Sequence, residues 1–226
     1  MASKITIPDL KKIRVTDPLF SHYAGMVAKK MIPVQWEILN GKQGQSRCFC
    51  IDNFRIAGGT LQGEHRGVVF GDTDAYKWLE AVAYCANNGE TEYIPEADEL
   101  IEIIGQAQQP DGYLNTYFTV CHPELRWKNL TEGHELYSAG HLIEAAVAYY
   151  NATGKRRLLD IAARFADLIC QTFGDGEGQI PGYPGHQEIE LALVKLWRVT
   201  GEERYLKTAR FFLDCRGRTP NYLLRE

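Results

Sequence analysis

The stretch that decides the fold is residues 144–169, which read EAAVAYYNATGKRRLLDIAARFADLI. An apolar helical pattern ends at Gly154, a short basic turn follows, and a second helical pattern begins at once. The same arrangement, with a charged turn, occurs in residues 79–104 and in residues 191–214. The chain therefore repeats one unit, a helical hairpin, three times.

The three units align on the glycine that ends their first helix. A large apolar residue stands four positions after each glycine and an alanine stands eight positions after it, so both fall on one face of the second helix. The aligned residues are Gly89, Tyr93 and Ala97, then Gly154, Leu158 and Ala162, then Gly201, Tyr205 and Ala209. The glycines are 65 and 47 residues apart, so the hairpins are joined by long, unequal loops. We predict an all-α fold in which the first helices form an inner layer.

The first part of the chain has a different pattern. Residues 1–60 predict an irregular N-terminal segment with a helix near 22–39 and an extended piece near 48–56, and residues 61–226 form the hairpin domain. Cys48 and Cys50 alternate in the extended piece and could supply two ligands of a metal site. Without further ligands nearby, this pair gives only weak support for a metal centre.

Composition narrows the function classes. The 226 residues carry 25 basic and 29 acidic side chains, a formal charge of −4, which disfavours nucleic-acid binding. No run of 18 apolar residues could span a bilayer, and the first residues lack the apolar core of a signal peptide, so we expect no membrane partner and a cytoplasmic location. The six cysteines are scattered and form no CxxC motif, which disfavours a disulfide framework or a zinc finger.

The loops that precede the first helices hold the candidate site residues. Asp72 and Asp74 precede the first unit, His134 the second and His186 the third. Because the first helices run in the same direction, we expect these four side chains to converge at the N-terminal mouth of the inner layer. The alternatives are N-caps for the aspartates and packed core residues for the histidines.

Three further features fit a saccharide site. His134 follows a glycine at a helix start, where free N–H donors suit neutral hydroxyl groups. His186 is expected to begin the third unit's first helix, with Glu190 one turn later; this HxxxE pair alone does not define a metal site. Tyr113 follows a Pro-Asp-Gly turn in a loop rich in tyrosine and asparagine. The predicted sugar-binding residues are His134, His186, Asp72, Asp74 and Tyr113.

Four strings resemble a known family. They are residues 69–84 (VFGDTDAYKWLEAVAY), 107–118 (AQQPDGYLNTYF), 134–150 (HELYSAGHLIEAAVAYY) and 184–206 (PGHQEIELALVKLWRVTGEERYL). They resemble the N-terminal half of the catalytic domain of family 127 glycoside hydrolases, the β-L-arabinofuranosidases, and the resemblance extends from about residue 13 to 222. It implies an (α/α)6 toroid, of which this chain holds the N-terminal portion, and removal of terminal β-L-arabinofuranose with retention of configuration.

The resemblance also bears on cofactors and partners. In the family, a zinc-bound cysteine thiolate is the nucleophile and a glutamate is the acid/base, and these groups lie in the second half of the toroid. None of the six cysteines here matches the family's paired-cysteine motif, so we expect neither zinc nor a catalytic residue in this chain. His134 and His186 carry over as residues that contact the arabinose ring in the family. We therefore expect a half-domain that binds an arabinose-containing saccharide and is inactive alone.

Two alternatives stay open at this point. The chain could be a non-catalytic saccharide-binding or assembly module that pairs with a second chain supplying the rest of the toroid. It could also be another α/α toroid sugar enzyme, such as an epimerase or an unsaturated uronyl hydrolase. Enzymes of acidic sugars are expected to have a cationic pocket, and the loops described above contain few arginines.

Overall fold

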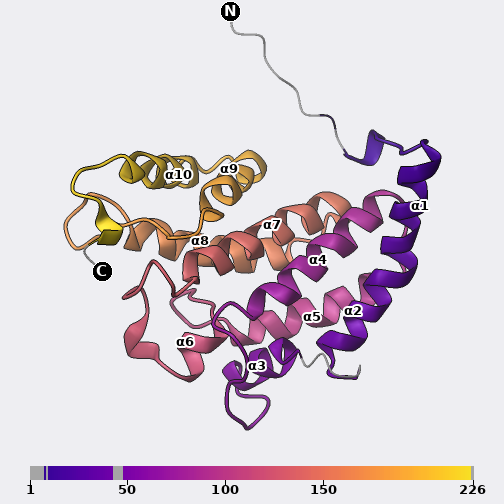
Figure 1. Cartoon of the computed structure of the whole chain (residues 1–226), viewed down its shortest axis with the longest axis horizontal. Coiled ribbons are helices and arrows are strands. Elements are labelled where there is room, and N and C mark those ends of the chain that lie inside the picture. Colours follow the sequence, from indigo (N-terminus) through magenta and orange to yellow (C-terminus); the bar gives the residue numbers. More distant parts are fainter. Residues whose placement is uncertain (1–7, 9, 43–47, 225–226) are drawn as a thin grey trace, which may run out of the picture.

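The computed structural model describes residues 8, 10–42 and 48–224, which are helical apart from loops and one isolated bridge between Phe173 and Ile180 (Figure 1). The α-helices are α1 (Pro18–Met26), α2 (Ile32–Leu39), α3 (Cys50–Ala57), α4 (Asp72–Asn87), α5 (Ile94–Ala107), α6 (Thr116–Val120), α7 (Glu135–Thr153), α8 (Arg157–Thr172), α9 (Ile189–Thr200) and α10 (Glu203–Arg216). A π-helical segment (Val27–Met31) joins α1 to α2, and short 3-10 turns lie at Leu10–Lys12, Pro123–Leu125 and Tyr222–Leu224. None of the helices in these ranges is long and apolar enough to cross a membrane.

The three predicted hairpins are confirmed as α4–α5, α7–α8 and α9–α10. Gly154 and Gly201 end α7 and α9 in the left-handed conformation, with φ of 76° and 78°. Gly89 follows α4 with φ of 92°. Glycine adopts these angles without the steric cost that a Cβ would add, and so it stops one helix and lets the next begin.

The first helices of the hairpins form an inner layer and run in the same direction. Their N-terminal ends adjoin one another: the ring centroid of Phe70, before α4, lies 5.1 Å from that of His134, before α7, which in turn lies 5.7 Å from that of His186, before α9. Their C-terminal ends line one groove. With α5, α8 and α10 as the outer partners, the arrangement is a partial α/α toroid (Figure 1).

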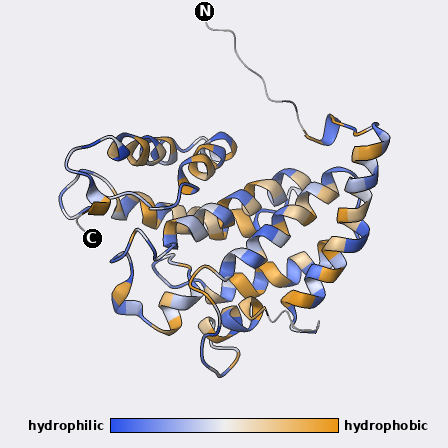
Figure 2. Ribbon diagram, in the orientation of Figure 1, coloured by the Kyte–Doolittle hydropathy of each residue, from blue (hydrophilic) through white to orange (hydrophobic). Residues whose placement is uncertain are grey.

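The aligned packing residues lie where the repeat predicts them. Ala97, Ala162 and Ala209 are buried, as are Leu158 and Tyr205. The ribbon of Figure 2 shows hydrophobic and hydrophilic residues alternating along the helices, as expected for helices with one buried face. The small alanine side chains allow the two helices of each hairpin to approach closely.

The N-terminal segment differs from the prediction in one element. The helix expected near 22–39 is present, because α1, the π-helical segment and α2 follow one another without a break. The prediction of an extended segment near 48–56 is wrong, because Cys50–Ala57 form α3. Cys50, Ile51 and Phe54 are buried at helical spacing, and this pattern outweighs the two-residue alternation of the cysteines. The predicted segment also includes residues 1–7, 9 and 43–47, which lie outside the described residues.

Candidate functional site

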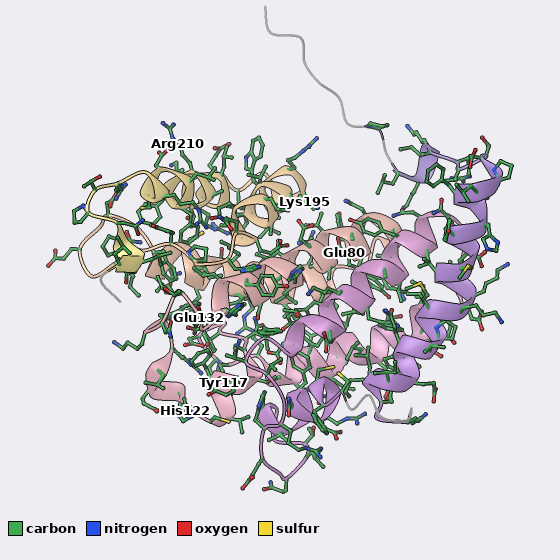
Figure 3. The ribbon with its side chains drawn as sticks, in the orientation of Figure 1. Glu80, Tyr117, His122, Glu132, Lys195 and Arg210 are labelled. Carbon is green, nitrogen blue, oxygen red and sulfur yellow. The ribbon has the colours of Figure 1, made fainter. Side chains whose placement is uncertain are left out.

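His134 lies at the mouth of the inner layer, immediately before α7. Its backbone is left-handed, with φ of 55°, which is uncommon for a residue other than glycine. Its ring Nδ1 lies 2.6 Å from the carbonyl oxygen of Glu132, which Figure 3 labels in the loop leading to α7. A carbonyl oxygen only accepts, so Nδ1 carries the proton in this contact and Nε2 of a neutral ring is left as an acceptor. The imidazole can therefore accept a hydrogen bond from a sugar hydroxyl.

His186 faces His134 across a small hollow, as predicted. Their ring centroids are 5.7 Å apart, and the hollow that both rings line has a volume of about 10 Å³, room for about one water molecule. His186 lies in the loop before α9 and not in the helix, because α9 begins at Ile189; this corrects the predicted helix start. A Cβ on the preceding residue, Gly185, would lie 2.6 Å from the carbonyl oxygen of Thr131, so glycine allows the two loops to meet. The hollow is lined by Asn129, Leu130, Thr131, His134, Glu135, Leu136, Tyr137, Pro184 and His186.

Tyr137 is the centre of this cluster, although the sequence did not single it out as a site residue. The centroid of its ring lies 5.7 Å from that of His134, 5.0 Å from that of His186 and 4.5 Å from that of His141. Its hydroxyl accepts a hydrogen bond of 2.9 Å from Lys77 Nζ. The spacing of three and four residues between His134, Tyr137 and His141 was the signal that could have identified it.

His141 forms the inner boundary of the cluster. Its Nδ1 lies 3.5 Å from Glu188 Oε1. Burial, followed by the charge of Lys77, lowers the pKa of His141 to about 4, so the ring is neutral at pH 7. The uncharged imidazole of His141 therefore lies near both the Glu188 carboxyl group and the charge of Lys77.

Glu135, the first residue of α7, holds the loop residues next to the mouth in place. Its carboxyl group is buried and accepts hydrogen bonds from the Tyr113 hydroxyl at 2.5 Å and from the Trp127 backbone N–H at 2.8 Å. Burial raises the pKa of Glu135 to about 7. Trp127 has φ of 61°, and with His134 it makes up the pair of non-glycine residues with positive φ in the described chain. Glu135 therefore connects two locally strained residues: it binds the backbone of Trp127, and it directly follows His134 in the sequence.

Asp72 and Tyr113 have structural positions. Asp72 is buried in the first turn of α4, and its two carboxylate oxygens accept hydrogen bonds from the backbone N–H and the hydroxyl of Thr116. Burial raises the pKa of Asp72 to about 6. Tyr113 is fully buried, with its hydroxyl on Glu135. The structure does not place these two side chains among those that line the hollow, and both hold loops in place; their predicted sugar contacts stay a prediction.

Asp74 lies on a neighbouring groove and not beside the histidines. Its Oδ2 is 3.6 Å from the Cys48 thiol, and it lines the groove between α2 and α4. Neither aspartate is an N-cap, because the capping position of α4 is Gly71 and no side chain caps it. Of the four residues predicted to converge at the mouth, His134 and His186 therefore lie together, whereas Asp72 and Asp74 lie elsewhere.

The described residues do not fit a resident metal ion. Within residues 8, 10–42 and 48–224, no group of three or more histidine, cysteine, aspartate or glutamate side chains could hold one. The zinc centre that the resemblance implies for the complete family enzyme is therefore not assigned to any of these side chains, and no chemical step here is derived through it.

Comparison with known proteins agrees with this geometry. Residues 12–225 match the family described as β-L-arabinofuranosidase, GH127 catalytic domain. A non-reducing end β-L-arabinofuranosidase from Bifidobacterium longum subsp. longum is 37% identical to this chain, covering 95% of it and 35% of the relative. The family match places the chain with this family and not with the epimerase or uronyl hydrolase alternatives.

Two solved structures superpose closely. A GH127 β-L-arabinofuranosidase from Geobacillus stearothermophilus T6 is 54% identical with a TM-score of 0.89, and a second GH127 β-arabinofuranosidase is 36% identical with a TM-score of 0.85. Each alignment covers 94% of this chain and 34% of the other, so the chain spans about a third of the length of these relatives. Because the family match extends over nearly all of the sequence and both solved relatives share its fold, the chain belongs to the β-L-arabinofuranosidase family GH127.

Proposed function

We propose that this chain forms the sugar-recognition part of a retaining β-L-arabinofuranosidase and binds the terminal arabinofuranose of an arabinose-containing saccharide. The observation that carries the proposal is the pairing of His134 and His186 across one hollow at the mouth of the inner helices. Two imidazoles that contact one small hollow can bind two hydroxyl groups of one sugar ring. The names of the relatives, all arabinofuranosidases, support this choice of sugar.

The neighbouring side chains suit a neutral furanose. Tyr137 and Phe70 present aromatic surface next to His134, where the C–H groups of a sugar can make apolar contacts. Lys77 donates a hydrogen bond to the Tyr137 hydroxyl, which holds this lysine against the protein. The hollow thus combines hydrogen-bonding imidazoles with uncharged rings, which favours a hydroxyl-rich ligand over an acidic one.

The proposal assigns recognition, and not bond cleavage, to these residues. Retaining hydrolysis needs a nucleophile and a separate acid/base near the anomeric carbon. The carboxyl groups nearest to the histidines are already occupied: Glu135 by Tyr113 and Trp127, and Glu188 by His141. In this proposal the zinc, the thiolate and the acid/base glutamate of the family belong to the part of the family's domain that the chain does not span.

Binding measurements test the proposal. In calorimetric titration with methyl β-L-arabinofuranoside, His134→Ala and His186→Ala should each weaken binding about 2- to 10-fold, since a neutral hydrogen bond is worth about 0.5–1.5 kcal/mol. His122→Ala is the matched control, because His122 is a half-buried histidine that follows α6, contacts Tyr117 and does not line the hollow (Figure 3). Unchanged affinity in both mouth variants, with a loss of thermal stability, would show that the histidines only pack.

A second candidate is an assembly module that joins a separate chain carrying the rest of the toroid. A groove of about 570 Å³ favours it, because this groove opens along the C-terminal ends of α4, α7 and α9. It is lined by apolar residues such as Val147 and Val199 and by the ion pair between Glu144 and Lys195, and Figure 3 labels Lys195 and Glu80 on this side. Co-expression with a chain carrying the remaining hairpins should restore hydrolysis of an aryl β-L-arabinofuranoside if the enzyme is split.

A further inference from the structure

Two cysteine thiols meet at the start of α3. Cys50 is the first residue of the helix and is 2% exposed, whereas Cys48 lies just before the helix and is half-buried. Their sulfur atoms are 3.4 Å apart. Closing a disulfide requires the two sulfurs to approach from this distance to about 2.05 Å.

Small molecules can reach one of the two thiols. Cys48 and Asp74 line a groove of about 490 Å³ that runs between α2 and α4. Cys50 does not line this groove and is enclosed by the core. The pair therefore has one accessible sulfur and one protected sulfur within bonding reach of each other.

The surroundings give the two thiols different reactivities. The thiol–thiol hydrogen bond lowers the pKa of Cys48, although burial and the charge of Asp74 oppose this effect. The same hydrogen bond, together with burial, raises the pKa of Cys50. An accessible thiol with a lowered pKa beside a buried thiol with a raised pKa is the arrangement found in cysteines that react with oxidants and are then resolved by a neighbouring thiol.

We propose that Cys48 and Cys50 form a reversible dithiol–disulfide site that reacts with low-molecular-weight disulfides such as glutathione disulfide. The Cys48 thiolate attacks one sulfur of the small disulfide, which forms a mixed disulfide and releases one thiolate. The Cys50 thiol then gives its proton to solvent and attacks the Cys48 sulfur, and the second small thiolate leaves and is protonated. Two cysteine thiols are oxidised, and one small disulfide is reduced to two thiols.

Formation of the disulfide also removes a hydrogen bond to Asp74 in the groove. The reduced Cys48 sulfur lies 3.6 Å from Asp74 Oδ2, and its thiol is a hydrogen-bond donor to that carboxylate. After oxidation, the sulfur carries no proton to donate, so Asp74 loses this partner. The proposal does not depend on sugar binding, because Asp74 lies outside the histidine hollow.

Peptide mass spectrometry tests the site directly. Trypsin cleaves after Arg47 and Arg55, so residues 48–55 (CFCIDNFR) form one peptide that contains both cysteines. After incubation of the purified chain with glutathione disulfide and quenching with an alkylating reagent, this peptide should be lighter by two hydrogens and should carry no alkyl group. Treatment with dithiothreitol before alkylation should restore the doubly alkylated peptide. The exposed Cys121 is the internal control and should show only a glutathione adduct.

Two variants separate the roles of the thiols. Cys50→Ser should stop the reaction at a glutathione adduct on Cys48, because no resolving thiol is left. Cys48→Ser should leave Cys50 unmodified, because Cys50 is buried. A wild-type peptide that stays doubly alkylated while Cys121 is fully converted would overturn the proposal. Ready modification of Cys50 in Cys48→Ser would overturn the assigned order of attack.

Discussion

The two ends of the inner helices differ although the same three helices form both. At the C-terminal ends, Gly154 and Gly201 stop α7 and α9 with almost the same left-handed angles. At the N-terminal ends, the left-handed residues before and near α7 are His134 and Trp127, which pay a steric cost that glycine avoids. The comparison shows that one end is built for regular chain reversal and the other for holding particular side chains in place.

The largest effect should come from removing the support of the mouth. Glu135→Ala would leave the Tyr113 hydroxyl and the Trp127 N–H buried without a partner, and each unsatisfied group costs about 1–3 kcal/mol. At pH 6, where the carboxyl group is mostly protonated, we expect a loss of about 4 kcal/mol in the free energy of unfolding, measured by urea titration. Glu135→Gln keeps an oxygen that accepts from the Trp127 N–H, and its NH2 group can donate to the Tyr113 hydroxyl oxygen, so it should cost less than Glu135→Ala. Equal losses in the two variants would contradict the role of these hydrogen bonds.

The free energy of unfolding should also depend on pH through Glu135. Burial raises the pKa of Glu135 to about 7 in the folded chain, from 4.5, so the folded state holds its proton more tightly than the unfolded state. Stability is therefore lost as pH rises from about 5 to about 7, by about 3 kcal/mol from this group. His141 acts with the opposite sign, because its lowered pKa costs stability as pH falls from 6.5 towards 4. The difference between the wild type and Glu135→Gln isolates the first contribution, and parallel pH profiles would rule it out.

The regular hairpin contacts should be less sensitive. Ala162→Leu and Ala209→Leu would overfill sites that are fully buried, at a cost of about 1–3 kcal/mol. Ala24→Leu in α1 is the matched control, since Ala24 is exposed and should change stability little. Urea midpoints measure all three. Tolerance of leucine at both buried positions would mean that the aligned alanines do not mark the hairpin contact.

A smaller effect compares the two kinds of left-handed residue. Gly154→Ala adds a Cβ with no atom within 4 Å, so its cost of about 1 kcal/mol is purely conformational. His134→Gly should be more stable than His134→Ala by a similar amount, because both remove the ring and glycine alone relieves the strain at φ of 55°. Thermal melts of the four proteins measure these differences. Equal stability of His134→Gly and His134→Ala would show that the mouth stores no backbone strain.

Much of the fold could be predicted because its signals are local. A glycine, a large apolar residue and an alanine at fixed spacing specify each hairpin without knowledge of the rest of the chain. The position of α3 was missed because the prediction rested on the alternation of Cys48 and Cys50 and not on the helical spacing of Cys50, Ile51 and Phe54. The structure adds a tertiary contact, because the Asn53 side chain bonds both backbone groups of Arg66, thirteen residues away. A two-residue alternation cannot reveal such a contact.

The site was predicted in part for the same reason. His134 and His186 could be paired because each immediately precedes or lies close to the start of a parallel helix. Asp72 occupies a similar sequence position, but its carboxylate turns into the core towards Thr116, which follows α5. Sequence position gives the end of the helix at which a residue lies, whereas the direction of its side chain depends on which loop packs against it.

The last prediction is that the chain alone has no hydrolytic activity. We expect no measurable hydrolysis of an aryl β-L-arabinofuranoside by purified residues 1–226, with or without added zinc, because binding alone does not stabilise an oxocarbenium-like transition state. The carboxyl groups beside the histidines are held by the protein: Glu135 at the support of the mouth and Glu188 against His141. A heat-inactivated sample is the control, and release of the aryl group is the measurement. Turnover above this control that is lost in His134→Ala would place a catalytic pair within the mouth, and Glu135 with Asp72 or Asp74 would then be the first residues to replace.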